Sequence, residues 1–304
     1  MLTAIIAVTL TVSDVAAVEE TYGEYFGYQV VERGQLTSEL AQVLQAAQLE
    51  GNEFLLMQPE SGEPVYLRVI QQDETEGFAA MKTWGWNSNE ILVQDTYAVH
   101  ERLKDSPFQI IGEPRGLSMN PNIIAMQVLG PANELIYLTR IPEGKSLFNL
   151  GSAKSFIDRT FIVVLGGPDI AAMQSFYADR LGMPTTHPAP STISVLANAY
   201  GLPPDHSFKL GIVRFPENFL IELDEYPPQA TARPQRPGEL PPGMAVVSFA
   251  VDDLDQLDVE FLAPPRVVGA APYEGRRVAL TRGVAGELIE LIENTGDTPG
   301  ANTD

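Results

Sequence analysis

One sequence pattern occurs twice in this chain, and the duplication limits the folds that it can adopt. The stretch VTLTVSDVAAVEETYGEYFGY, residues 8–28, returns about 155 residues later as VVLGGPDIAAMQSFYADRLGM, residues 163–183. Aligned without a gap, an aspartate, two alanines, a tyrosine and a glycine recur at the same places. The protein is therefore built from two related halves, and each half can be interpreted against the other.

Composition narrows the class of protein. At 304 residues the chain has room for two domains of ordinary size. The 40 acidic and 19 basic residues give a net charge of -21, which repels a phosphate backbone, so we expect no nucleic-acid partner. The absence of cysteine excludes disulfides and thiolate metal sites. No apolar run approaches the roughly 18 to 20 residues of a spanning helix. We therefore expect a soluble, acidic, cytoplasmic protein with no membrane partner.

Each copy of the repeat has the pattern of a strand followed by an amphipathic helix. Ser13 or Asp14 in the first half, and Asp169 in the second, stand where an N-cap side chain would accept the first free amide groups of the helix. Gly27 and Gly182 stand where a helix ends in a left-handed residue. The halves should thus begin with the same local structure.

The rest of each half continues with a helical insert and further strands, and a second strand-and-helix pattern begins at Glu90 and at Ala245. This order predicts four related βαβββ modules, two in each half. We expect an α+β protein with domains over residues 1–143 and 158–295, followed by a disordered polar tail over 296–304. The proline-rich segment 227–243 is interpreted as a stiff connector between modules, with a polyproline ligand as the alternative.

Three elements together resemble one superfamily. They are the strand that leads into D-x-A-A, the helix end FYADRLGM (residues 176–183) and the closing strand GELIELIE (residues 286–293). The chain is similar in these motifs to the vicinal oxygen chelate superfamily, which includes glyoxalase I, bleomycin-resistance proteins and extradiol dioxygenases. The resemblance implies two tandem glyoxalase-like domains, in each of which two modules form an open cup-shaped sheet. In the first half the motifs are degraded to TYGEYFGY and NELIYLTR.

In the enzymes of that superfamily, a divalent metal sits in the cup, held by residues of the first and last strands of each module. Strand alternation puts Glu222 and Glu290 on inward-facing positions of the second half. The matching first-strand positions are Ile162 and Val246, where the family enzymes usually place histidine. Both histidines that an extradiol dioxygenase would need are missing, so we do not expect that activity.

The equivalent positions in the first half are Ala7, Arg68, Tyr137 and either Ser88 or Asn89. None of these is a good metal ligand, so the cup of the first half is expected to be a degenerate site. Arg68 and Tyr137 would instead give it a cation and a phenol hydroxyl that could bind a carboxylate or phenolate, with an internal arginine–glutamate pair as the structural alternative.

Two carboxylates alone hold divalent ions weakly, so Glu222 and Glu290 permit three interpretations. They could bind a divalent metal with help from substrate or water. They could act without metal, one as acid and one as base, because close carboxyl groups can hold different protonation states. They could also be hydrated remnants of an ancestral site. We expect no cofactor, with a divalent metal as the alternative.

Three further residues are candidates for ligand contact. Trp84 and Trp86 would suit a planar apolar ligand at a cup mouth, although bridging two modules is equally compatible. His206 flanks the helical insert of the second half and could reach a cup as a base, although a surface loop position would also explain it.

These observations predict a glyoxalase-like, bleomycin-resistance-like protein that binds a small apolar or aromatic molecule without a catalytic metal. The alternative is a divergent lyase, isomerase or hydrolase that uses Glu222 and Glu290 with or without a weakly bound divalent metal. A degenerate domain kept for homodimer formation or partner binding is a third hypothesis.

Overall fold

Four successive modules make up the chain. The computed structural model describes residues 1–117, 120–146 and 148–294, so the predicted tail over 296–304 lies outside the described residues. Module 1 contains β1 (Leu2–Val12), α1 (Val15–Thr21), η1 (Tyr22–Phe26), β2 (Gln29–Gln35), α2 (Ser38–Val43), η2 (Ala47–Leu49), β3 (Glu53–Gln58) and β4 (Tyr66–Gln71). Module 2 contains β5 (Gly85–Val93), α3 (Thr96–Leu103), β6 (Gln109–Gly116), β7 (Ile124–Leu129) and β8 (Leu135–Arg140).

The second half repeats this layout. Module 3 contains β9 (Ile157–Gly167), α4 (Ile170–Ser175), η3 (Phe176–Arg180), β10 (Ala189–Thr192), α5 (Ser194–Ala199), β11 (Ser207–Arg214) and β12 (Leu220–Glu225). Module 4 contains β13 (Gly243–Val251), η4 (Leu254–Gln256), β14 (Arg266–Val268), β15 (Arg276–Arg282) and β16 (Leu288–Glu293). The helix expected after the strand that begins near Ala245 is reduced to the single 3-10 turn η4.

Aspartate N-caps begin the helix of every module. The Asp14 side chain accepts from the amide of Ala17, and that of Asp169 accepts from two amides of α4, as predicted. Asp95 and Asp253 do the same in the other two modules. In the two repeat copies, Gly27 and Gly182 follow at positive φ, 74° and 66°. These short-range signals fix where each helix starts and stops.

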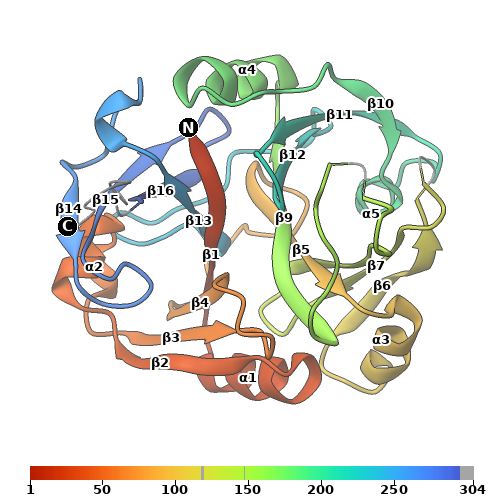
Figure 1. The fold of residues 1–304 in the computed structure, drawn as a ribbon, viewed down its shortest axis with the longest axis horizontal. Helices are drawn as coiled ribbons and strands as arrows, with labels where there is room; N and C mark the ends of the chain where they lie inside the picture. Colours follow the sequence, from red (N-terminus) through yellow and green to blue (C-terminus); the bar gives the residue numbers. More distant parts are fainter. Residues whose placement is uncertain (118–119, 147, 295–304) are drawn as a thin grey trace, which may run out of the picture.

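The modules form two eight-stranded curved sheets, as expected for the fold class (Figure 1). Sheet I has the order β14-β15-β16-β13-β1-β4-β3-β2, and sheet II has the order β10-β11-β12-β9-β5-β8-β7-β6. Sheet I therefore joins module 1 to module 4, and sheet II joins module 2 to module 3. The expectation that the two modules of one half share a sheet is wrong, and the ranges 1–143 and 158–295 separate the copies of the duplication, not the two sheets.

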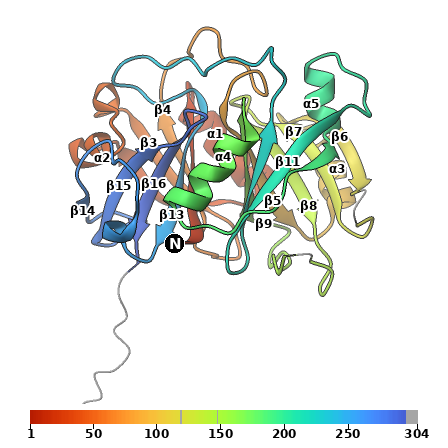
Figure 2. The same ribbon diagram turned by 90° about the horizontal axis from the view of Figure 1, so that it is seen from above.

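Two crossover segments explain this pairing. Residues 72–84 carry the chain from sheet I to sheet II, and residues 226–242 carry it back (Figure 2). The crossovers run side by side, because the Trp84 amide donates to the Thr231 carbonyl at 2.9 Å and the Thr231 amide donates to Lys82. The proline-rich segment is thus the connector that was expected, but it links the two sheets.

The largest apolar core lies between the sheets. It contains buried residues of both sheets and of α1, α3 and α4, and Figure 1 shows α1 and α4 at opposite ends of the space between them. The helical inserts α2 and α5 lie on the outer sides, where each sheet presents its concave face (Figure 1). We call these concave faces cup I and cup II. None of the helices in the described ranges has the length and apolar character needed to cross a bilayer.

The repeated tyrosine and the closing-strand glutamate form a matched pair in each half. The Tyr22 hydroxyl donates to Glu134 at 2.7 Å, and the Tyr177 hydroxyl donates to Glu287 at 3.4 Å. Both glutamates also accept a backbone amide two residues before them, at 2.9 Å. Because each pair joins a helix of one sheet to the last strand of the other, the repeat motif fastens the two sheets together.

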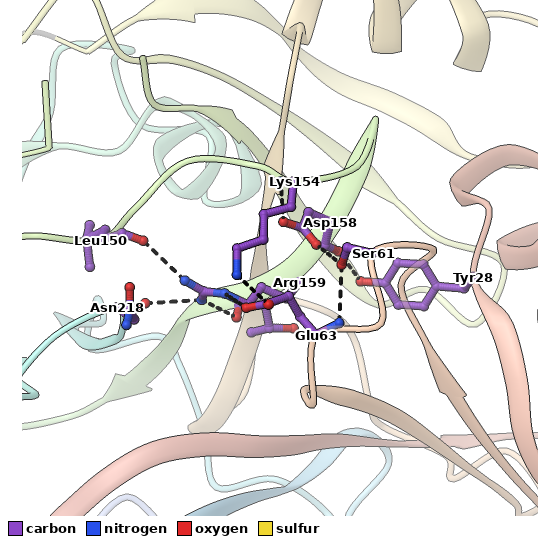
Figure 3. Close-up of polar contacts among 9 residues, drawn as sticks. Tyr28, Ser61, Glu63, Leu150, Lys154, Asp158, Arg159 and Asn218 are labelled. Atoms are coloured by element: carbon purple, nitrogen blue, oxygen red, sulfur yellow. Dashed lines mark hydrogen bonds and ion pairs between the residues drawn. The ribbon is translucent and has the colours of Figure 1, made fainter. Parts of the chain in front are cut away.

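A polar junction fastens module 1 to the start of β9 (Figure 3). The buried Asp158 accepts from the Ser61 hydroxyl at 2.5 Å and from the Lys154 amide at 2.7 Å, and its carbonyl accepts from the Tyr28 hydroxyl at 2.7 Å. Arg159 donates to three backbone carbonyls and lies 3.5 Å from Glu63. With its hydrogen-bonding groups so well matched, this junction is structural.

Candidate functional site

Glu222 and Glu290 do not share a site. Glu222 lies on β12 of sheet II, whereas Glu290 lies on β16 of sheet I. Arg68 and Tyr137, expected together in the other cup, are separated in the same way, on β4 and β8. The exchange of modules between halves therefore gives Glu290 the partner Arg68, and gives Glu222 the neighbour Tyr137. A cation shared by the two glutamates is excluded.

Cup I contains a buried ion pair at its centre. The Arg68 guanidinium lies 3.1 Å from Glu290, and both side chains have no solvent exposure. Arg68 also donates to Thr9 at 2.8 Å, while Glu290 accepts from the hydroxyls of Tyr273, at 2.8 Å, and Ser248. Every group in this set has partners, so the pair is the internal arginine–glutamate alternative noted above.

Apolar side chains fill the remainder of cup I. Residues of α2, Leu40 and Val43, pack with Leu56, Tyr273 and Leu280 into a separate buried cluster. The four positions that the fold family uses for metal are here Thr9, Arg68, Ser248 and Glu290, and a guanidinium occupies their centre. These residues do not fit a metal ion, and cup I serves as a core.

Cup II has a different centre. Adjacent strands place Tyr137 opposite Glu90, and Val164 opposite both Glu222 and Ser88. Asp224 follows Glu222 on the same face, because side chains alternate along a strand. Tyr137 and Glu222 are partly exposed, whereas the central residues of cup I are fully buried. Cup II is therefore the concave face that keeps access to solvent.

Burial and mutual repulsion shift the acidic groups of cup II strongly. Burial raises the pKa of Glu90 to about 7, against a hydrogen bond from Thr139 at 2.5 Å that lowers it. Burial also raises the pKa of Asp224 to about 8. For Glu222, burial and then its neighbours Asp224 and Glu90 raise the pKa well above its usual value. Near neutral pH the cluster holds protonated and ionised carboxyl groups together, so it can both donate and accept hydrogen bonds.

Several buried polar atoms of cup II have no hydrogen-bond partner among residues 1–117, 120–146 and 148–294. They include Asp224 Oδ1, the Tyr226 and Tyr200 hydroxyls and Ser88 Oγ. Asp224, Tyr226 and Ser88 are at most 4% exposed. Leaving such an atom unsatisfied costs about 1 to 3 kcal/mol, so this group is poised to bind water or a ligand. In cup I and in the junction of Figure 3, by contrast, the buried polar groups have hydrogen-bond partners.

The walls of cup II are apolar and aromatic. The insert helix α5 contributes Val195 and Leu196, which pack with Phe208 and Tyr226. A surface pocket of about 330 Å³ opens beside Tyr226 and includes His206 in its lining. His206 is exposed and packs against Phe208 with ring centres 4.8 Å apart. It therefore lies at the edge of the cup, away from the carboxyl cluster.

The two tryptophans have separate positions. Trp86 is buried in the core between the sheets, where its Nε1 donates to the Leu288 carbonyl of sheet I at 2.7 Å. It is thus the module bridge that was the alternative to a ligand contact. Trp84 is partly exposed and packs against the apolar cluster of cup II. Its buried Nε1 has no hydrogen-bond partner in the described part of the chain.

Sequence reasoning missed Glu90 and Asp224. The register shows that the first-strand positions opposite the last strands are Thr9, Glu90, Val164 and Ser248. The positions deduced from the sequence, Ala7, Ser88, Ile162 and Val246, have the correct face but lie two residues too early. An acidic residue inside the apolar run EILV, and a second acid two residues after Glu222, were the available signals.

No group of three histidine, aspartate or glutamate side chains suited to a metal ion occurs within residues 1–117, 120–146 and 148–294. The acids of cup II do not meet that geometry, and no histidine joins them. Neither cup therefore fits the metal centre that the fold family implies.

The comparisons with known proteins identify the fold. No protein-family model and no curated protein sequence matches the chain. Glyoxalase I from Zea mays aligns with a TM-score of 0.62 at 14% identity, covering 95% of this chain and 92% of the other. The chain has the fold of glyoxalase I. A mutant of that enzyme gives a TM-score of 0.65 at 14% identity, covering 95% and 93%. A provisionally assigned dioxygenase from Bacillus subtilis gives 0.61 at 13% identity, covering 98% and 86%. The expected vicinal oxygen chelate fold is confirmed over nearly the whole length.

Proposed function

We propose that this glyoxalase-fold protein binds a small organic molecule in cup II and does so without a metal cofactor. The observation that carries the proposal is the set of unpartnered buried polar atoms, Asp224 Oδ1, the Tyr226 hydroxyl and Ser88 Oγ, on a concave face. Such atoms among apolar and aromatic walls are typical of a small-molecule site. Cup I, whose polar groups satisfy one another, offers no comparable place.

Binding of aromatic probes tests this proposal. Phenol, benzyl alcohol and 2-naphthol would be titrated by calorimetry and by protein NMR, and metal content would be measured on protein purified without chelator. We expect saturable binding that shifts resonances of cup II, with well under one metal ion per chain. Binding should weaken in Tyr226→Phe and Glu222→Gln. Glu134→Gln is the matched control, because it neutralises a buried carboxyl outside both cups.

Shifts confined to the core between the sheets, or stoichiometric metal whose loss abolishes probe binding, would contradict the proposal. The pocket beside His206 provides a second comparison. A His206→Ala variant should change affinity less than Glu222→Gln, because His206 is exposed at the rim.

A second candidate function is metal-free acid–base catalysis by the same cluster. It is favoured by the pKa of about 7 for Glu90 and about 8 for Asp224, since a catalytic acid or base works best when its pKa is near the operating pH. This version of the lyase or isomerase hypothesis uses Glu222 with Asp224 and Glu90, and not with Glu290. Deuterium incorporation into hydroxyacetone in D₂O, followed by NMR, tests it. Exchange no faster than in Glu222→Gln protein would rule it out.

A further inference from the structure

The two cups correspond residue by residue. In sheet I, Arg68 of β4 lies opposite Thr9 of β1, in parallel register. In sheet II, Glu222 of β12 lies opposite Val164 of β9, again in parallel register. Arg68 and Glu222 lie on the last strands, β4 and β12, of the equivalent modules 1 and 3, and each points into its own cup. The same position therefore carries a basic side chain in cup I and an acidic one in cup II.

Cup I contains its own cation. The Arg68 guanidinium contacts Glu290 at 3.1 Å and Thr9 at 2.8 Å, and it also donates to the Tyr273 hydroxyl. The carboxylate of Glu290 is thereby neutralised inside a closed core, which is the condition under which a buried charge is tolerated. A planar nitrogen cation is thus compatible with this depth of the curved sheet.

In the part of the chain that the structure describes, no basic side chain pairs with the acids of cup II. Glu222 occupies the position of the arginine, with Asp224 and Glu90 as neighbours. Two basic side chains beside the aromatic wall of cup II, Arg233 near Tyr226 and Lys82 near Tyr200, are engaged elsewhere. Arg233 donates to Thr83 and to three backbone carbonyls, and the Lys82 ammonium donates to the Ala199 carbonyl and lies 3.9 Å from the centre of the Tyr200 ring.

The unsatisfied atoms are of the kind that an N–H cation would complete. Asp224 Oδ1 is an acceptor, and the Tyr226 and Ser88 hydroxyls can accept as well as donate. The ring of Tyr226 packs closely against Gly166, where an added Cβ atom would clash with it. Tyrosine rings beside carboxyl groups favour cations with an apolar body, because the ring face also attracts positive charge.

We propose that the ligand of cup II is a small organic cation, an amine or amidine on an aromatic or apolar body, whose N–H groups donate to Glu222, Asp224 and Glu90. This inference rests on the proposed function and names its ligand class. The ligand supplies in cup II the positive group that Arg68 supplies in cup I. An inorganic divalent cation is the competing occupant, and it is an outcome of the test.

The test compares charged probes with neutral probes of the same shape. Benzamidine and benzylamine would be titrated against benzamide and benzyl alcohol by calorimetry at pH 8, with MgCl₂, MnCl₂ and ZnCl₂ as separate ligands. We expect each cation to bind at least about tenfold more tightly than its neutral counterpart. The advantage should disappear in Glu222→Gln and in Asp224→Asn, and it should persist in the matched variant Glu134→Gln.

A second variant imitates cup I. Glu222→Arg places a guanidinium beside Glu90 and Asp224, and it should abolish benzamidine binding while circular dichroism shows a folded protein. Equal affinity for charged and neutral probes would overturn the cation inference and leave the proposed function standing. Tighter binding of a divalent metal, with displacement of benzamidine, would also overturn it. No binding of any organic probe would overturn both proposals.

Discussion

Acidification from pH 8 to pH 5 should stabilise this protein, and two buried glutamates should account for much of the effect. Burial raises the pKa of Glu134 and that of Glu287 from 4.5 to about 7. The folded protein therefore binds these protons more tightly than the unfolded chain does. The stability that each group contributes is complete below about pH 4.5 and is lost as the pH rises through about 7. With about 1.4 kcal/mol per pKa unit, each group loses about 2 to 3 kcal/mol between pH 5 and pH 8.

Replacing both groups by glutamine removes this linkage and preserves the shape. A glutamine amide can accept from the backbone amide and donate to the tyrosine hydroxyl that each glutamate contacts. The double variant Glu134→Gln/Glu287→Gln should therefore be more stable than the native protein at pH 8. The change in its free energy of unfolding between pH 5 and pH 8 should be smaller than that of the native protein. The difference should be about 5 kcal/mol, because the effects of the two distant sites add.

Urea unfolding at pH 5, 6, 7 and 8, followed by tryptophan fluorescence, measures the effect. The variant Glu39→Gln, which changes an exposed carboxylate of α2, is the control and should retain the native pH dependence. The same pH dependence in the double variant as in the native protein would refute the reasoning, as would a stability that falls on acidification from pH 8 to pH 5.

Three further predictions concern the cups and the interface between the sheets. Arg68→Met should destabilise the protein by about 3 to 5 kcal/mol, because it leaves a buried carboxylate unpaired, whereas Arg68→Met/Glu290→Gln should recover most of that loss; chemical denaturation of both variants checks this. Trp86→Phe should cost about 1 kcal/mol or more, through the lost hydrogen bond to Leu288 and the smaller ring, seen as a lower Tm. Asp224→Asn should raise stability at pH 7 by at least about 1 kcal/mol, because burial disfavours the ionised form; a lower urea midpoint would contradict this.

Local structure was predictable from the sequence because its causes are local. The aspartates that cap α1 and α4, the glycines that end the helices and the two inserts all depend on residues a few positions apart. The choice of partner modules depends on contacts between distant residues. The first strands of all four modules are apolar and similar, so β1 could pair with β5 as well as with β13 on pattern alone.

The candidate site was predictable to the same extent. Alternation correctly placed Glu222 and Glu290 on concave faces, but whether they meet depends on the pairing of modules. The first-strand positions were counted back from the capping aspartates two residues too far in every module, although the parallel pairings of first and last strands contain no bulge, and the count therefore missed Glu90. An internal pair between Arg68 and a glutamate was one of the expected alternatives, but Glu290 was placed in the other cup.

The residues of sheet II lie, in the sequence, between the two parts of sheet I, and this order determines which strands can pair first during synthesis. All strands of sheet II come from the continuous span 85–225, whereas sheet I combines residues 2–71 with residues 243–293. During synthesis, β1 must therefore wait with an unpaired apolar edge until β13 leaves the ribosome, and pairing across so many residues is slow. We expect sheet II to form first, as a template whose core face holds module 1 until module 4 arrives to close sheet I.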